Sequence, residues 1–274
     1  MTRRLVSAKR IAREGGPVRY RARLEYDGTD FRGFQVQPDG RTVQGELETA
    51  LARLSGGTRI RVHGAGRTDA GVHASGQVIA FTWTGRLSRE GLHRSLDSLL
   101  PGDIAIGPLQ RVPLGFRPRS AARTREYRYS IWNGPRSPLR ERVAMGIREA
   151  LDVEAMAAAA TLLVGRHDFS AFGAWHRQPV RTLHRVRVRR VGRMITIEVI
   201  GDAFLRQMVR SIVAALLRIG RGEATADDLS AALQSRERAF AGAIVPAHGL
   251  NLRRVRFETG NRDKGLKHDD DEDL

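Results

Sequence analysis

Residues 18–28, VRYRARLEYDG, open the regular structure of the chain. Apolar and charged residues alternate along this stretch, with Val18, Tyr20, Ala22, Leu24 and Tyr26 on one side and Arg19, Arg21, Arg23 and Glu25 on the other. A period of two predicts a half-buried β-strand. Asp27-Gly28 predicts the turn that ends this strand.

Helices and further strands follow in the N-terminal part of the chain. Their spacing predicts a helix over 43–54, strands over 58–62 and 77–83, and a helix through Leu99 that Ser88 caps. Pro101-Gly102 stops the last of these helices, because proline and glycine do not continue a helix.

A comparable series follows in the C-terminal part. It predicts strands over 124–132, 180–191, 194–200 and 250–257, and helices over 152–164, over 204–219 and after a Thr225/Asp228 capping box. Tyr127, Tyr129 and Ile131 lie on one side of the first of these strands. We therefore predict an α+β protein of two similar halves, each a mainly antiparallel sheet with helices on its outer face.

We place the two halves at residues 17–115 and 116–258, because the first series of predicted strands and helices ends and the second begins within residues 112–123. Residues 1–16 form a basic arm and residues 259–274 end in an acidic run. Such charged ends bury nothing, and we expect the arm to be flexible and the tail to be disordered and solvated. An acidic tail that competes with an anionic ligand for the basic surface stays open as an alternative.

The composition indicates a polyanionic partner. The 274 residues include 47 Lys+Arg against 30 Asp+Glu, a formal net charge of +17. Lysine occurs only at Lys9, Lys264 and Lys267, so 44 of the 47 are arginines. Guanidinium binds phosphate bidentately and stacks on bases, which favours nucleic acid. An arginine-biased proteome is the alternative explanation.

Several classes of protein are excluded at this stage. With no cysteine the chain has no disulfide, no thiolate metal site and no cysteine nucleophile. No apolar run approaches the ~20 residues of a membrane span, and the basic N-terminus lacks the apolar stretch of a signal peptide. We expect a soluble cytoplasmic protein without membrane association.

The stretch richest in candidate chemistry is GAGRTDAGVHA, residues 64–74. It fails as a dinucleotide fingerprint because Asp69 stands where Gly or Ala is needed, and it fails as a P-loop because Val72 and His73 follow Gly71. What remains is the Asp69 carboxylate in a glycine-rich loop, two residues after Arg67. A turn aspartate bonded to its own backbone is the alternative. No metal site is expected, because Asp69 and His73 have no third ligand nearby.

Two arginine rows lie on predicted strands, namely Arg19, Arg21 and Arg23, and Arg185, Arg187 and Arg189. Either row could follow RNA phosphates. Either could equally be the solvated face of a sheet, and the sequence leaves both readings open.

The segment GRTDAGVHA, residues 66–74, resembles the signature of the TruA-type tRNA pseudouridine synthases. Further resembling segments follow in the family's order at 24–51, 100–106, 125–133, 204–213 and 248–252, so the resemblance spans residues 18–257. Two positions depart from the family: Phe34, where many members carry tryptophan, and Asn251, where an aromatic is frequent. Both are interpreted as packing or rim changes.

The resemblance implies a homodimeric enzyme, without a cofactor, that converts uridine to pseudouridine at tRNA positions 38, 39 and 40 in the anticodon stem-loop. It also implies an active-site cleft between the two halves. Cleavage of the bond from C1′ to N1 develops positive charge at C1′, which one carboxylate can stabilise or capture. By resemblance that carboxylate is Asp69. Attack at C1′ and removal of the C2′ proton both stay open.

The resemblance also assigns three substrate-binding residues. Arg67 holds the surroundings of the flipped nucleotide, Tyr127 stacks on the target uracil, and Arg210 pairs with Asp69. The Tyr127 hydroxyl is also a candidate for removing the C5 proton, and Tyr129 is expected to pack in the core. The alternative for Arg210 is a helix arginine facing solvent. Two rival functions remain: a non-catalytic tRNA-binding or folding module, and an RNA N-glycosidase.

Overall fold

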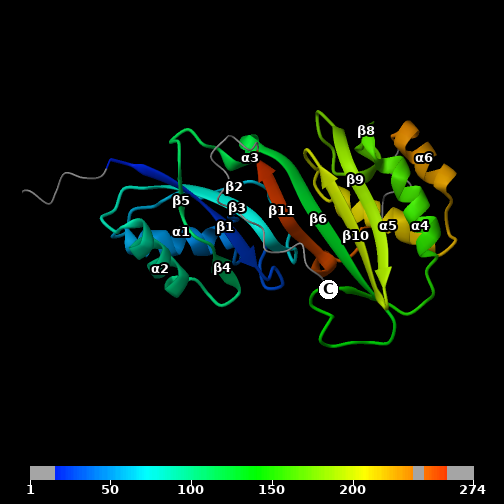
Figure 1. The fold of residues 1–274 in the computed structure, drawn as a ribbon, viewed down its shortest axis with the longest axis horizontal. Helices are drawn as coiled ribbons and strands as arrows, with labels where there is room; N and C mark the ends of the chain where they lie inside the picture. The colour runs from blue at the N-terminus through cyan, green and yellow to red at the C-terminus, as the bar shows by residue number, and fades with distance from the viewer. Residues whose placement is uncertain (1–15, 237–243, 258–274) are drawn as a thin grey trace, which may run out of the picture.

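The computed structural model describes residues 16–236 and 244–257. The predicted basic arm 1–16, except Gly16, and the predicted acidic tail 259–274 lie outside the described residues. Figure 1 shows a long twisted sheet with one group of helices near each end. No helix among the described residues is long and apolar enough to cross a membrane.

The chain up to residue 121 contributes five strands and three helices to the described structure, the last helix lying just past the predicted boundary at 115/116. In chain order they are β1 (Val18–Tyr26), α1 (Val43–Leu54), β2 (His63–Gly64), β3 (His73–Trp83), α2 (Arg89–Leu99), β4 (Ile104–Ile106), β5 (Gln110–Val112) and α3 (Pro118–Ala121). Side-chain caps mark two of the predicted helices: Thr42 Oγ1 accepts from the Gly45 N–H, and Ser88 Oγ accepts from the Gly91 N–H. Such caps satisfy backbone donors that a helix start leaves free.

The C-terminal half supplies the remaining elements. They are β6 (Ala122–Asn133), β7 (Met145–Ile147), α4 (Val153–Ala160), η2 (Thr161–Leu163), β8 (Gly165–Asp168), η3 (Ser170–Phe172), β9 (Val180–Val191), β10 (Met194–Gly201), α5 (Met208–Gly220), α6 (Ala226–Ser235), η4 (Ala247–Gly249) and β11 (Leu250–Phe257). The Thr225/Asp228 capping box is present at the start of α6. Helix α5 is almost wholly buried and belongs to a core that is continuous through both halves.

The predicted α+β class is confirmed, but the two halves share one sheet instead of forming two. The strand order is β4-β1-β3-β11-β6-β10-β9-β8, with β2, β5 and β7 paired at its side. Strand β11 pairs in parallel with β3 and antiparallel with β6 (Figure 1). This last strand of the described residues thereby covers two edges that would otherwise be exposed. The domain boundaries 17–115 and 116–258 stay a prediction.

Two predicted elements differ in the structure. Residues 58–62 form no strand, and only His63–Gly64 pairs there, as β2. Helix α5 begins at Met208 and not at Phe204, because Gln207 adopts a left-handed backbone conformation with φ 65°. That conformation interrupts a helix, and it frees Phe204 to lie edge-on against Tyr127 with ring centroids 5.1 Å apart.

Candidate active site

The signature loop, residues 65–72, connects β2 to β3 and is hydrogen-bonded to side chains of β3 and β1. The fully buried Gln77 amide donates to the Gly66 carbonyl at 3.0 Å and accepts from the Gly66 N–H at 3.2 Å. The Tyr26 hydroxyl and Thr68 Oγ1 are hydrogen-bonded at 2.8 Å. These bonds hold neighbouring residues of the loop, Gly66 and Thr68, against the sheet.

The turn after β1 lies directly against this loop. A Cβ at Gly28 would lie 2.0 Å from the Val72 carbonyl oxygen, so only glycine allows this approach. The imidazole of the buried His73 accepts from the Gly28 N–H at 3.0 Å. The other ring nitrogen lies 2.8 Å from the Arg142 carbonyl oxygen. His73 therefore joins chain segments and does not reach toward a ligand.

Asp69 lies in the signature loop with two arginines of the C-terminal half beside it. Arg210 Nη1 is 3.7 Å from Asp69 Oδ2, and Arg206 Nε is 4.0 Å from Asp69 Oδ1. The Asp69 side chain is 31% exposed, so it is half-enclosed but reachable. The structure thus places Arg210 at the carboxylate and not in open solvent.

The two arginines differ in how firmly they are held. The Arg210 side chain is only 13% exposed, and its Nε donates to the Val245 carbonyl at 2.7 Å. The Arg206 side chain is 75% exposed. Arg206 and Arg210 flank the start of α5, where the helix macrodipole is positive. The carboxylate therefore sits in a positive environment to which the fixed, enclosed Arg210 contributes more than the solvated Arg206.

Tyr127 faces the signature loop from β6. Its side chain is buried, and its hydroxyl oxygen would lie 3.8 Å from a Cβ placed on Gly66. Burial raises the pKa of Tyr127 to about 12, with Asp69 raising it further and Arg125 opposing the shift. The hydroxyl is accordingly protonated at neutral pH.

Tyr129 lies two residues along the same face of β6. It is fully buried, and its hydroxyl donates to the Pro246 carbonyl at 2.9 Å. This is the core-packing role expected for it.

The raised pKa of Tyr127 predicts a loss of stability at high pH. The unfolded tyrosine ionises near pH 10 and the folded one near pH 12, so this contribution is complete below pH 10 and is lost as pH rises from 10 to 12. One such group accounts for roughly 1 kcal/mol at pH 11. Urea unfolding at pH 9, 10 and 11 should show a shallower decline for Tyr127→Phe than for the unchanged protein. Equal declines would contradict the burial argument.

Arg67 lies away from the carboxylate. It is exposed and lines a cavity of about 570 Å³ together with other cationic residues. Within the described residues, no ion pair or hydrogen bond joins Arg67 to Asp69. The structure therefore brings together Asp69, Arg210 and Tyr127, and it leaves Arg67 on an adjoining surface.

Arg125 is a site residue that the sequence interpretation missed. Its side chain is buried on the same face of β6 as Tyr127, and its guanidinium donates to the carbonyls of Ala65 (3.0 Å), Arg119 (2.7 Å) and Asp202 (2.6 Å). These bonds tie the signature loop to the C-terminal half. The period of two through Tyr127 and Tyr129 could have predicted this burial, because it places residue 125 on the buried face of the same strand.

Replacing Arg125 by methionine is expected to lower the free energy of unfolding by about 3 kcal/mol, since buried carbonyls would lose charged donors. Chemical denaturation of the full chain measures this. The matched control is Arg128→Met on the exposed side of β6, where the side chain is 39% exposed and lies 3.9 Å from Glu198. That control should change stability by less than about 1 kcal/mol. Equal effects of the two substitutions would refute the anchoring role.

Arg206 was also missed, although it stands four residues before Arg210 in the FLRQMVR segment. The carbonyl of Arg206 accepts from the Ala174 N–H at 3.0 Å. The next residue, Trp175, is 88% exposed. Trp175 is thus an exposed aromatic one residue from the backbone contact with Arg206, and an isolated tryptophan in a loop gave no pattern that predicts it.

A carboxylate, two arginines and a buried tyrosine thus lie together where the signature loop meets β6 and the start of α5. The sequence profile of the tRNA pseudouridine synthases matches residues 22–119 and 159–258.

Three similar proteins bear the name tRNA pseudouridine synthase A. The one from Geobacillus kaustophilus is 41% identical over 86% of this chain and 93% of its own. The one from Geotalea uraniireducens is 43% identical over 84% and 95%, and the one from Thermotoga neapolitana is 43% identical over 87% and 99%. The chain therefore belongs to the tRNA pseudouridine synthase family, as its resemblance indicated, and this family consists of isomerases.

Proposed function

We propose that this protein isomerises uridine to pseudouridine at positions 38, 39 and 40 in the anticodon stem-loop of tRNA, with Asp69 as its catalytic residue. Family membership supports the reaction and the class of substrate. The observation that carries the assignment of Asp69 is its position in a loop hydrogen-bonded to the sheet, half-exposed and 3.7 Å from the enclosed Arg210.

The reaction needs few protein groups beyond this carboxylate. The bond from C1′ to N1 breaks, the base turns, a bond from C1′ to C5 forms, and the hydrogen of C5 leaves as a proton. Uracil departs as a delocalised anion, so no second carboxylate is needed to protonate it. Asp69 either captures C1′ or removes the C2′ proton, and its position suits both routes.

Tyr127 supplies a surface for the uracil in this proposal. Burial raises the pKa of Tyr127 to about 12, so the side chain is protonated at pH 7. The neutral side chain is therefore better suited to stacking and hydrogen bonding than to removing the C5 proton. Phe204 holds the ring edge-on and limits its motion.

The arginine surface would bind the body of the tRNA. In β9 the residues Arg185, Arg187 and Arg189 are exposed, whereas in β1 the side chain of Arg19 is buried and bonded within the protein. The β9 row is thus the better phosphate contact.

We also propose a homodimer in the cytoplasm, where tRNA resides. Two exposed apolar side chains, Leu139 (94%) and Trp175 (88%), support a further macromolecular contact.

Incubation of the purified full chain with an unmodified tRNA transcript, without added cofactor, tests the proposed reaction. We expect pseudouridine at one or more of positions 38, 39 and 40, mapped at single-nucleotide resolution, and no free uracil. Release of uracil would identify an N-glycosidase. Tight binding without either product would identify a non-catalytic tRNA-binding module.

A salt titration tests the mode of binding. If several arginines contact phosphates, the logarithm of the tRNA association constant should fall steeply and linearly with the logarithm of salt concentration. A flat response between low and moderate salt would contradict an arginine-lined RNA surface.

A further inference from the structure

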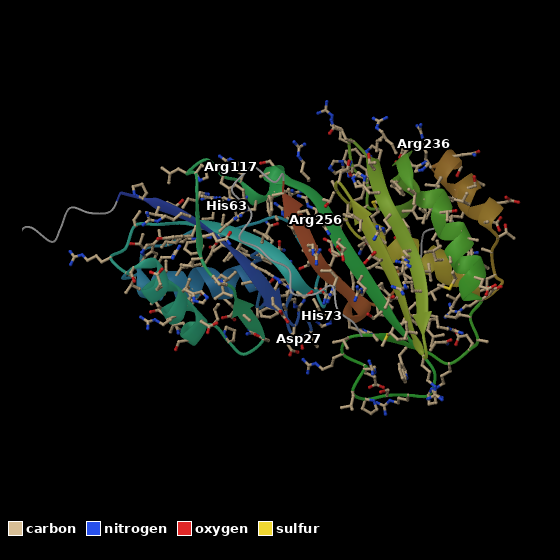
Figure 2. The ribbon with its side chains drawn as sticks, viewed as in Figure 1. Asp27, His63, His73, Arg117, Arg236 and Arg256 are labelled. Atoms are coloured by element: carbon tan, nitrogen blue, oxygen red, sulfur yellow. The ribbon has the colours of Figure 1, made fainter. Side chains whose placement is uncertain are left out.

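A cationic cavity of about 570 Å³ opens next to the Asp69 site, between β2 and α3. We call it the arginine pocket and define it by the basic residues that line it: Arg61, His63, Arg67, Arg117 and Arg119. Figure 2 shows His63 and Arg117 together at the upper margin of the sheet, at the opposite end from Asp27 and His73. Its volume lies within the ~300–1,000 Å³ typical of ligand pockets.

The pocket arginines pair with no carboxylate in the part of the chain that the structure describes. Among the described residues, Arg61, Arg67, Arg117 and Arg119 form no ion pair. Glu48, whose charge acts on His63, accepts from Arg59 at 3.2 Å. Clustered like charges repel one another unless an anion lies between them.

A further guanidinium lies beneath the pocket. Arg19 is buried, and it donates to the Phe116 carbonyl at 2.7 Å and to Thr82 Oγ1 at 3.0 Å, which are neutral acceptors. Burial and Arg117 lower the pKa of Arg19, and burial with Arg19, Arg61 and Arg117 lowers the pKa of His63. His63 is thus a neutral hydrogen-bonding group at pH 7, in a pocket whose positive potential comes from arginines.

The pocket adjoins the catalytic loop through shared residues. Gly66 and Arg67 line it, and they precede Asp69 by three and two positions. The buried Arg125 donates to the carbonyls of both Ala65 and Arg119, one in the signature loop and one in the pocket wall. The spacing between the pocket and the carboxylate is therefore fixed by the fold.

We propose that the arginine pocket binds the phosphodiester backbone that flanks the flipped uridine; the identity of this ligand as tRNA rests on the proposed function. Guanidinium groups suit a phosphodiester because they bind its oxygens in pairs. Flipping a base costs a few kcal/mol, and contacts to the flanking backbone offset that cost without reading a base edge. Such contacts fit an enzyme that accepts neighbouring positions.

The first test removes two pocket charges with Arg61→Gln/Arg117→Gln. Both side chains are exposed, so folding should be unaffected. The matched control is Arg94→Gln/Arg166→Gln, which removes the same charge from the exposed surfaces of α2 and β8. We expect the pocket variant to raise KM for tRNA about tenfold or more with kcat within threefold, and the control to raise KM less than threefold. Equal changes in the two variants would overturn the proposal.

The second test locates the phosphate. A methylphosphonate is placed on either side of the target uridine in a tRNA assembled by ligation, and dissociation constants are measured. The neutral linkage should weaken binding to the unchanged protein about fivefold and should have no further effect on the pocket variant. If the neutral linkage weakens binding equally for the unchanged protein and the pocket variant, the pocket contacts another part of the RNA or only free anions. That result would refute the proposal. Absence of pseudouridine with the unchanged protein would instead refute the proposed function, and the binding cycle would still report on the pocket.

Discussion

Asp69→Asn is expected to lower the rate of pseudouridine formation at least about a thousandfold while the tRNA dissociation constant stays within a few-fold. Asparagine has the shape of aspartate, but it carries no charge to stabilise C1′ and forms no ester with it, and it is a poor base for the C2′ proton. Binding survives because most affinity for RNA comes from phosphate contacts elsewhere. Single-turnover conversion with excess protein measures the chemical step.

The variant must be folded for this comparison to count. Asp69 is partly exposed, and its side chain has no hydrogen bond within the described residues, so thermal unfolding should change little. If a folded Asp69→Asn variant still forms pseudouridine at a tenth of the original rate, Asp69 is not the catalytic residue.

Arg210→Met should have the second largest effect, a loss of about ten- to hundredfold in kcat. At an effective dielectric constant near 20, unit charges about 4 Å apart interact by about 4 kcal/mol, and solvation of the partly exposed carboxylate offsets much of this. Arg210 is 13% exposed and is further fixed by the Val245 carbonyl, so its contact with Asp69 persists.

Arg206→Gln is the matched comparison, because it removes an equal charge from the same carboxylate. Arg206 is 75% exposed and 4.0 Å away. A solvated pair of this kind contributes 0–1 kcal/mol, so kcat should fall less than about fivefold. Steady-state kinetics of both variants decide the point. If Arg206→Gln lowers kcat as much as Arg210→Met or more, then the enclosure of Arg210 does not determine which arginine contributes more to kcat.

Elements whose ends are marked by side chains could be predicted from the sequence. Ser88 and the Thr225/Asp228 box cap their helices as expected. The left-handed Gln207 at the start of α5 could not be predicted, since glycine usually marks that conformation. The predicted strand over 58–62 lacks a pairing partner, and periodicity alone carries no information about partners.

The shared sheet was beyond prediction for the same reason. Strand β11 follows the signature loop by more than 170 residues, yet Asn251 pairs with His73. Asn251, which departs from the family pattern, accepts from the Ser75 N–H at 3.0 Å. Phe34, the other departure, is buried and lies 6.5 Å from Tyr26 between ring centroids. Phe34 thus packs in the core and also lines the 570 Å³ cavity, whereas Asn251 acts as a hydrogen-bond acceptor, and the interpretation of the two departures stays a prediction.

The candidate site could be predicted in its residues but not in its arrangement. Asp69, Tyr127 and Arg210 were selected by resemblance, and the fold gathers them from the signature loop, β6 and α5. Arg67 does not lie with these three residues, because it lines the arginine pocket. Arg125 was overlooked since a buried arginine bonded only to carbonyls has no charged partner in the sequence to reveal it.

The most direct test of carboxylate chemistry at C1′ uses tRNA that carries tritium at C5 of its uridines. Isomerisation joins C1′ to C5, so each event must release one tritium to water and leave the base in the RNA. We predict tritium release matching the pseudouridine formed, no free uracil, and no release with Asp69→Asn. Undiminished release by that variant would contradict the assignment.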